Sequence, residues 1–267
     1  MFNKTIYIGG VARSGTSWIG QIINSCLNVR YRFQPFFSYE FKNVISEESS
    51  EKEITDLFKN IYETNSLFLT QEDKVKKGIY PNFKKENENI LVFKENRYQS
   101  FIEPILRKVP STFFVGVIRN PNATLYSWTQ NEKEFPLGSD IIKEWRFGNC
   151  KNTGNEDYFG YYKWKEVANL YLDLKEKYPD RVYLIHYDSF IKNLNFEVKM
   201  LYDFLGLNID VQTYNFINTS SKRNDTSYYS VFKGAKNKNE WKEKLPQYII
   251  DEINQDLKST RLEKFLI

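Results

Sequence analysis

Residues 10–18 of the chain read Gly-Val-Ala-Arg-Ser-Gly-Thr-Ser-Trp, after an apolar run at 5–8 and before apolar residues that recur at helical spacing. This pattern predicts a strand, a loop and a helix. Backbone N–H groups at the start of such a helix converge on one point, where the helix dipole favours an anion. Gly15 lets the backbone approach a phosphate closely, and Thr16 and Ser17 add hydroxyl donors. The stretch therefore predicts a phosphate-binding loop.

The spacing of this loop resembles the P-loop of nucleotide-binding enzymes, G-x-x-x-x-G-K-[ST], but Thr16 stands at the lysine position. Kinases and ATPases of that class use the lysine to contact the outer phosphates. Its absence argues against hydrolysis of a nucleoside triphosphate. The cation here is Arg13, which comes two residues before Gly15 instead.

Alternating strand and helix patterns continue along the chain. Such alternation is typical of a parallel sheet with helices on both faces. With 267 residues the chain fits one α/β domain, 1–267, in which the charged, Asn-rich segment 42–89 is expected to be a surface excursion or lid. The patterns predict further strands at 29–33, 90–93, 112–118 and 182–185, and helices near 54–62, 101–106, 121–128, 164–172, 198–205 and 247–257.

Composition and charge narrow the class of protein. Hydrophobic residues make up 41% and charged residues 27%, as in globular chains. No apolar run is long enough for a membrane span and no signal-peptide pattern is visible, so we expect a cytoplasmic protein in which Cys26 and Cys150 are reduced. Two cysteines and one histidine offer no ligand cluster, so we expect no metal. The net charge of +4 fits an anionic ligand as well as nucleic acid and does not decide between them. The partner that we expect is a small-molecule or saccharide acceptor, not a nucleic acid.

A second anion-binding site is predicted where the strand 112–118 ends. Arg119-Asn-Pro121 follows directly, with Asn120 as helix N-cap and Pro121 at the first helical position. Ligands bind at this edge of open α/β sheets, and an arginine can grip a phosphate with two hydrogen bonds. Ser127 lies two turns into the helix on about the same face. Two anion sites at two strand ends suit a nucleotide with separate 5′ and 3′ phosphates.

Both segments resemble those of the sulfotransferases that use 3′-phosphoadenosine 5′-phosphosulfate (PAPS). Arg13-Ser-Gly-Thr-Ser-Trp18 is similar to their 5′-phosphosulfate loop, except that Ala12 replaces the usual proline. Val117 to Trp128 is similar to their 3′-phosphate segment, in which an arginine precedes a serine by eight residues. The similarity covers about 5–35 and 90–242. It implies a P-loop NTPase-like sulfotransferase architecture, with PAPS as co-substrate and no metal.

The resemblance also implies which residues contact the donor. Trp18 and Tyr187 would lie near the adenine, although Tyr187 reads equally well as a core aromatic at a strand end. Phe232-Lys233-Gly234 is similar to a loop that closes over the 3′-phosphate, but Phe232 replaces an arginine, and a solvated basic loop is the alternative. The implied donor-binding residues are Arg13, Ser14, Gly15, Thr16, Ser17, Trp18, Arg119, Ser127, Tyr187, Lys233 and Gly234.

Sulfuryl transfer needs a base for the acceptor proton and cations over the oxygens that gain charge. Arg13 is expected to stabilise the leaving oxygen. Lys94 follows the strand 90–93 and resembles the lysine of the family's Lys-Thr-His segment, where it would neutralise the transferring group. Asn96 stands where that segment has its histidine, so we expect the neighbouring Glu95 to be the base. The predicted catalytic residues are Arg13, Lys94 and Glu95.

The base has alternatives. Side chains alternate along a strand, which would direct Glu95 and Lys94 to opposite faces. Glu40 is the second candidate, although Gln34 occupies a position where related chains often carry an acid. His186, the only histidine, lies inside a strand and reads as a packed structural residue. The remaining cations Arg32 and Arg97 either bind an anionic acceptor or are ordinary surface charges.

The predicted function is transfer of a sulfuryl group from PAPS to a hydroxyl of a small molecule or saccharide. A carbohydrate is the expected acceptor, because carbohydrate sulfotransferases often use a glutamate base. The aromatic fraction of 17% also suits flat acceptors at the mouth of a cleft. Two alternatives stay open, namely a P-loop-like nucleotide kinase and a non-catalytic protein that binds PAPS or adenosine 3′,5′-bisphosphate (PAP).

Overall fold

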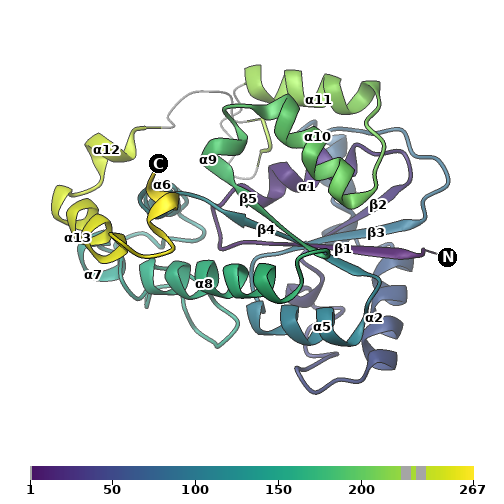
Figure 1. Cartoon of the computed structure of the whole chain (residues 1–267), viewed down its shortest axis with the longest axis horizontal. Coiled ribbons are helices and arrows are strands. Elements are labelled where there is room, and N and C mark those ends of the chain that lie inside the picture. Colours follow the sequence, from purple (N-terminus) through teal and green to yellow (C-terminus); the bar gives the residue numbers. More distant parts are fainter. Residues whose placement is uncertain (1, 224–229, 233–238) are drawn as a thin grey trace.

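The computed structural model describes residues 2–223, 230–232 and 239–267. Its centre is a five-stranded sheet in the order β2-β3-β1-β4-β5, and every neighbouring pair of strands is parallel (Figure 1). This confirms the predicted α/β class. The strands are β1 (Lys4–Gly9), β2 (Val29–Phe33), β3 (Ile90–Glu95), β4 (Thr112–Ile118) and β5 (Val182–His186).

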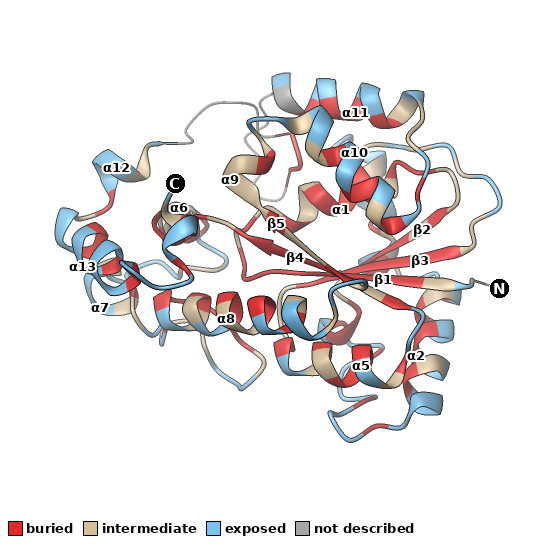
Figure 2. Ribbon diagram, viewed as in Figure 1, coloured by how far each residue is buried: buried red, intermediate tan, exposed pale blue. Residues whose placement is uncertain are grey.

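Helices cover both faces of the sheet, as the alternating pattern predicts. One face carries α1 (Thr16–Asn24), α10 (Leu194–Leu205) and α11 (Val211–Lys222), and the other carries α2 (Glu51–Glu63), α5 (Ile102–Lys108) and α8 (Tyr161–Lys177) (Figure 1). Each helix turns its buried side toward the strands (Figure 2). The core is therefore two apolar layers with the sheet between them.

Alternation along the strands supplies both layers. In β1, Ile6 and Ile8 belong to the layer under α1, whereas Tyr7 packs with Phe93 and Phe114 in the layer under α5 and α8. All of these side chains are buried. Strands with apolar side chains on both faces are what a doubly covered parallel sheet requires.

The order of the strands places a ligand-binding edge beside β1. The chain adds β2 and β3 on one side of β1, and β4 and β5 on the other. In open parallel sheets the crevice at such a reversal, outside the carboxyl ends of the strands, is where ligands bind. The loop after β1 lies at this edge.

Most sequence-predicted elements are confirmed. The bounds of β2, β4 and α13 (Gln247–Leu257) match the prediction, whereas β3 continues two residues farther, through Glu95. Asn120 caps α6 (Pro121–Thr129), because its side chain accepts from the N–H groups of Asn122 and Ala123. The remaining helices are α3 (Leu67–Thr70), α4 (Glu72–Lys76), α7 (Ile141–Glu144), α9 (Tyr187–Phe190), α12 (Trp241–Lys244), η1 (Pro35–Phe37), η2 (Gln99–Phe101) and η3 (Glu263–Leu266).

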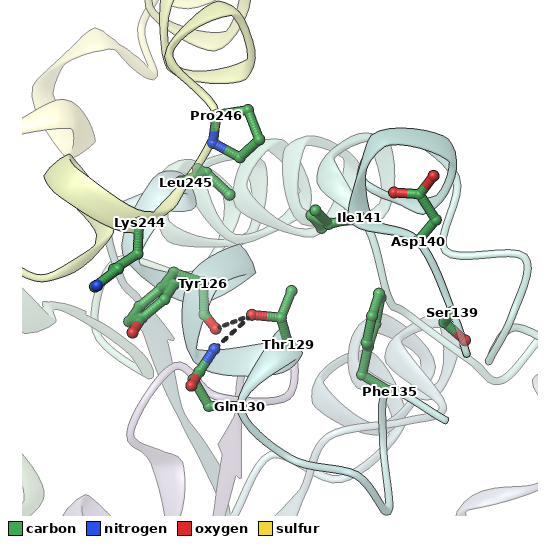
Figure 3. Close-up of a pocket in the computed structure, with 10 residues that line it drawn as sticks. All are labelled: Tyr126, Thr129, Gln130, Phe135, Ser139, Asp140, Ile141, Lys244, Leu245 and Pro246. Atoms are coloured by element: carbon green, nitrogen blue, oxygen red, sulfur yellow. Dashed lines mark hydrogen bonds between the residues drawn. The ribbon is translucent and has the colours of Figure 1, made fainter. Parts of the chain in front are cut away.

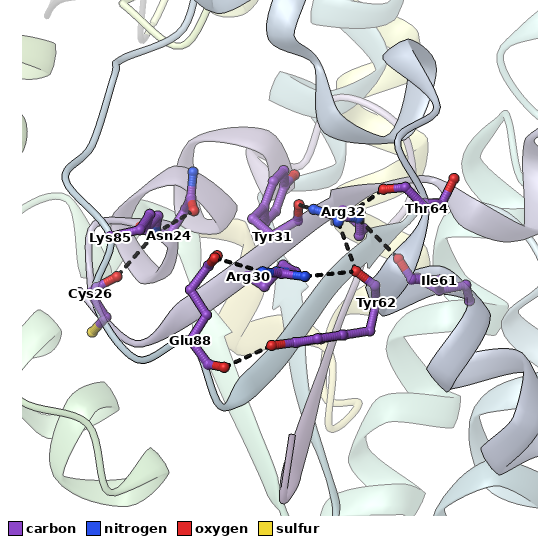
Figure 4. A network of polar contacts seen from close by, with 10 residues as sticks. All are labelled: Asn24, Cys26, Arg30, Tyr31, Arg32, Ile61, Tyr62, Thr64, Lys85 and Glu88. Carbon is purple, nitrogen blue, oxygen red and sulfur yellow. Dashed lines mark hydrogen bonds and ion pairs between the residues drawn. The ribbon is translucent and has the colours of Figure 1, made fainter. Parts of the chain in front are cut away.

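The segment 42–89 is more than a surface excursion, because α2 within it buries apolar side chains in the core. A capping box between Ser50 and Glu53 starts this helix. Arg32, which is 8% exposed, fixes its other end by donating to the carbonyls of Ile61, Tyr62 and Thr64 (Figure 4). The buried residues of α2 are Ile54, Leu57, Phe58 and Ile61.

None of the described helices combines the length and the apolar character that crossing a bilayer demands.

Candidate active site

The loop after β1 is shaped by Gly15. This residue has a φ of 95°, in the left-handed region that favours glycine. A Cβ at this position would also lie 2.7 Å from Cδ2 of Tyr187. Tyr187 begins α9 directly after β5, so the loop touches the end of a distant strand. Position 15 therefore requires glycine for both its backbone conformation and its contact.

Trp18 and Tyr187, the two predicted neighbours of the adenine, lie together. Their ring centres are 6.1 Å apart with the rings nearly perpendicular. The indole N–H of Trp18 donates to Ser220 Oγ at 2.9 Å, which ties the start of α1 to α11. The pair forms an aromatic corner beside Gly15.

The two predicted phosphate sites also meet. Arg119 Nη1 donates to the backbone carbonyl of Arg13 at 3.1 Å, and Arg13 Nε donates to Ser127 Oγ at 3.2 Å. The backbone carbonyl of Arg119 accepts from the indole N–H of Trp164, and the Arg119 guanidinium lies 5.4 Å from the ring centre of Tyr187. The end of β4, the first turns of α6 and the loop after β1 thus share one cation-rich edge.

Several donors in this region have no partner among the described residues. Arg119 Nε and Ser14 Oγ are both buried and make no hydrogen bond there. Buried polar groups are nearly always paired in folded proteins, by protein, water or ligand. Two buried donors without a partner in the described part of the chain therefore fit an anion such as a phosphate.

The hydroxyls of Thr16 and Ser17 already have partners. Thr16 Oγ1 donates to Asn96 Oδ1 at 2.9 Å. Burial raises the pKa of Tyr80 to about 12, and a side-chain hydrogen bond with Ser17 opposes that rise. Both hydroxyls have to exchange these contacts before they can donate to a phosphate.

Lys94 and Glu95 end β3 at the same edge. Lys94 is 2% exposed, its ammonium lies 4.6 Å from the ring centre of Phe33, and burial lowers its pKa. Glu95 is 0% exposed, and burial raises its pKa while Lys94 opposes the rise. Phe33 belongs to the layer under α1, and Phe93, one residue before Lys94, to the opposite layer. Alternation thus directs Lys94 toward the first layer and Glu95 toward the second.

The carboxylate of Glu95 is held by the turn that follows it. Its Oε1 accepts from the N–H groups of Asn96 at 3.0 Å and Arg97 at 3.2 Å. Its Oε2 is buried and has no hydrogen-bond partner among the described residues. One oxygen therefore keeps its capacity to accept a proton.

Glu40 and Glu134 differ in their distance from the cations. Glu40 is exposed, and its carboxylate accepts from Thr64 Oγ1 at 2.8 Å. Glu134 follows α6 and lies 4.0 Å from Arg13 Nε, close enough to Lys94 to raise the pKa of that lysine against the effect of burial. Sequence reasoning missed Glu134, because it stands in a loop with no motif around it.

Three other titratable side chains considered from the sequence have structural partners. Arg97 forms an ion pair with the buried Asp157 and lies over the ring of Phe37, so it is not an ordinary surface charge. Arg32 likewise uses its guanidinium to hydrogen-bond the carbonyls at the end of α2. His186 contacts Ser189 through Nδ1 at 3.1 Å, and burial lowers its pKa, as expected of a packed histidine.

The C-terminal part of the predicted donor site is described only in part. Lys233 and Gly234 lie outside the described residues. Phe232, which stands where the resembling loop has arginine, is buried and packs edge-on against Phe216 of α11. This substitution therefore puts an apolar side chain into the core in place of a cation.

The family model of the sulfotransferase domain matches residues 3–265. The chain belongs to this family. No curated protein matches the sulfotransferase. Among solved structures it is similar to mouse sulfotransferase SULT7A1 complexed with PAP, at 13% identity and a TM-score of 0.58 over 100% of this chain and 89% of that one. It is also similar to retinol dehydratase in a complex with retinol and PAP, at 12% identity and a TM-score of 0.57 over 98% and 83%.

The sulfotransferase has a cavity of about 620 Å³ between the end of α6, the loop that follows it and residues 244–246 (Figure 3). It lies beside the C-terminal half of α6, one turn beyond Ser127. In Figure 3, Tyr126 and Phe135 stand on opposite sides of it, with Thr129 between them. Glu134, whose carboxylate lies 4.0 Å from Arg13 Nε, directly precedes Phe135 of the cavity lining in the chain.

The part of the sulfotransferase that the structure describes contains no group of three or more His, Cys, Asp or Glu side chains that could hold a metal ion.

Proposed function

We propose that this sulfotransferase moves the sulfuryl group of PAPS onto a hydroxyl group of a carbohydrate. The observation that carries the proposal is the meeting of Arg13, Ser127 and Arg119 at the start of α1. One edge then offers cations and backbone N–H groups for both phosphate ends of a single nucleotide. The family match supports sulfuryl transfer as the reaction.

The proposed donor lies along this edge with its adenine in the aromatic corner. The 5′-phosphosulfate contacts the backbone N–H groups from Ser14 onward, and the 3′-phosphate contacts Arg119 and Ser127. The buried, unpaired Arg119 Nε and Ser14 Oγ gain partners on binding. A nucleotide without the 3′-phosphate would leave Arg119 without its ligand, which predicts selectivity for PAPS and PAP over AMP.

In the proposed reaction the acceptor oxygen attacks sulfur in line with the bridging oxygen. The S–O bond to the 5′-phosphate breaks, and PAP leaves with that electron pair. Arg13 stabilises the charge on the leaving oxygen, and Lys94 stabilises the transferring sulfuryl oxygens. A carboxylate takes the acceptor proton.

Two carboxylates are proposed as that base. Glu95 is the sequence-based choice, and its raised pKa suits a group that exchanges a proton near neutrality. Glu134 is favoured by position, because its carboxylate lies 4.0 Å from Arg13 Nε and its chain neighbour Phe135 lines the cavity. Comparing Glu95→Gln with Glu134→Gln distinguishes the two.

The cavity beside α6 supports a saccharide as acceptor. Its lining combines the aromatic faces of Tyr126 and Phe135 with the polar side chains of Thr129, Gln130 and Asp140. Sugar rings stack on aromatic faces through their C–H groups while amide and carboxylate groups bind their hydroxyls. The cavity also has the volume of an ordinary small-molecule site.

Calorimetric titration with PAP, AMP and ATP tests the donor site. We expect PAP to bind at least tenfold more tightly than AMP or ATP, and Arg119→Ala to abolish this preference. Arg107→Ala, at a half-exposed arginine that pairs with Glu103, is the matched control and should change nothing. ATP binding as tight as that of PAP, and indifferent to Arg119, would instead favour a nucleotide kinase.

Transfer of labelled sulfate from PAPS to panels of saccharides, phenols and sterols tests the acceptor class. We expect product with saccharides, and loss of it in Gln130→Ala. Product only with phenols or sterols contradicts the carbohydrate acceptor while leaving the donor site intact.

A non-catalytic PAP-binding protein is the second candidate. One observation favours it: Asn96, at the family's histidine position, is occupied by a hydrogen bond from Thr16. Tight PAP binding with no product from any panel, and no effect of Glu95→Gln or Glu134→Gln, would support this candidate.

A further inference from the structure

A second lysine reaches the edge where Lys94 lies. It is Lys74 of α4, from the segment 42–89. Its ammonium lies 4.8 Å from the ring centre of Phe33, and the ammonium of Lys94 lies 4.6 Å from the same centre. Two cations thus share one aromatic ring at the end of β2.

Lys94 is buried and Lys74 is partly buried. Lys94 makes no hydrogen bond or ion pair with the described residues, although it is 2% exposed. Burial lowers the pKa of Lys74; Asp73 opposes this shift and Lys133 adds to it. For Lys94, burial is again the main cause, and Lys74 and Arg13 add to it. Like charges held together in a poorly solvated place are stabilised when an anion binds between them.

The position of α4 is tied to the phosphosulfate loop. The backbone carbonyl of Lys74 accepts from the N–H groups of Ile79 at 2.9 Å and Tyr80 at 3.2 Å. Tyr80 is buried and forms a side-chain hydrogen bond with Ser17 of the loop. The ammonium of Lys74 also lies 5.2 Å from the ring centre of Tyr80 and donates to the side chain of the buried Gln71. Lys74 is therefore held in place before any ligand binds.

We propose that Lys74 is a further donor-binding residue, which together with Lys94 holds the sulfuryl oxygens of PAPS. This inference rests on the proposed donor. The sulfuryl group places a negative charge at a position that PAP does not occupy, so the contribution of Lys74 should appear with PAPS and not with PAP. It also gives the segment 42–89 a role, because α4 completes the donor site from the side of β2.

Competition binding of PAPS and PAP to the intact protein tests the proposal. We expect Lys74→Met to weaken PAPS binding at least fivefold and PAP binding less than twofold. Lys94→Met should give the same pattern. Lys77→Met, at an exposed lysine just after α4, is the matched control and should affect neither ligand. Lys74→Arg, which keeps the charge, should retain the preference for PAPS.

Other outcomes overturn the proposal in recognisable ways. If Lys74→Met binds PAPS as tightly as the wild type does, Lys74 does not contact the sulfuryl group. The same conclusion follows if the variant melts at the wild-type temperature but binds PAPS and PAP more weakly by the same factor. If Lys74→Met unfolds, the binding of PAPS and PAP is compared in Lys74→Arg and Lys74→Gln instead. Only Lys74→Gln, which removes the charge, should lose the preference for PAPS. Failure of wild type to bind either ligand rejects the proposed donor itself.

Discussion

The ring of Tyr187 occupies the space that any side chain at position 15 would enter. A Cβ on Gly15 would lie 2.7 Å from Tyr187 Cδ2, and closer still to Cε2. The tyrosine comes from the end of β5 and the glycine from the end of β1, with β4 between the two strands. Their contact therefore closes the phosphate loop against a strand two places away.

Gly15→Ala should damage both stability and donor binding. The left-handed backbone costs a non-glycine residue about 1–2 kcal/mol, and displacement of the tyrosine adds to this. We expect a lower melting temperature and PAP binding weakened at least tenfold. Thermal unfolding and calorimetry measure the two effects.

Gly138→Ala is the matched control for this substitution. Gly138 has a φ of 86°, but a Cβ there would meet nothing within 4 Å. It should show the backbone cost alone and leave PAP binding intact. Equal loss of stability in both variants would contradict a steric role for Tyr187.

Glu134→Gln should strengthen the binding of PAP. The carboxylate lies 4.0 Å from Arg13 Nε, where it competes with an incoming phosphate for the guanidinium. We expect PAP to bind several-fold more tightly to the variant, together with a fall in turnover if Glu134 is the base. Glu144→Gln, on α7, is the control. Weaker PAP binding in Glu134→Gln would mean that the carboxylate orients Arg13 rather than opposing the ligand.

Stability should depend on pH through Glu95. Burial raises the pKa of this carboxyl from 4.5 to about 7, so between these values the folded state holds a proton that the unfolded state has lost. The free energy of unfolding therefore receives a contribution from Glu95 that is complete below pH 4.5 and is lost as the pH rises through about 7. Glu95→Gln should remove this slope, which denaturant unfolding at several pH values can measure.

The same shift predicts the pH dependence of turnover. If Glu95 is the base, activity should rise through pH 7 as it loses its proton. Activity should then fall near pH 8, because burial lowers the pKa of Lys94 to about 8 and the protonated lysine is needed. Turnover that survives in Glu95→Gln and is lost in Glu134→Gln would instead assign the base to Glu134.

Arg32→Met should destabilise the protein without changing donor binding. Its guanidinium donates to three carbonyls at the end of α2, and without it the carbonyls of Ile61 and Thr64 would lose this donor, while that of Tyr62 would keep only the 3.4 Å hydrogen bond from Arg30. We expect a loss of roughly 2–4 kcal/mol in unfolding free energy. Arg30→Met, at a partly exposed neighbour that pairs with Glu88, should cost less. A large effect on PAP binding at unchanged stability would contradict this structural role.

Local signals predicted the sheet and the two phosphate segments, because each depends on residues close together in the chain. Apolar runs in the sequence predicted β2 and β4. Arg13 and Gly15, just before the start of α1, predicted the phosphate-binding loop. The role of α2 was underestimated, since its apolar face is diluted by the charged residues around it. Lys74 and Glu134 were missed for another reason: only the folding of distant segments brings them beside Arg13 and Lys94.

The hydrogen bond from Arg119 to the carbonyl of Arg13 links the two ends of the donor site mechanically. If Arg119 binds the 3′-phosphate as proposed, the same guanidinium also holds the loop that would receive the 5′ end. The site would therefore select a nucleotide by the distance between its two phosphates as well as by each phosphate alone. A ligand of the wrong length that satisfies one end would pull Arg119 away from the loop and leave the other end poorly held.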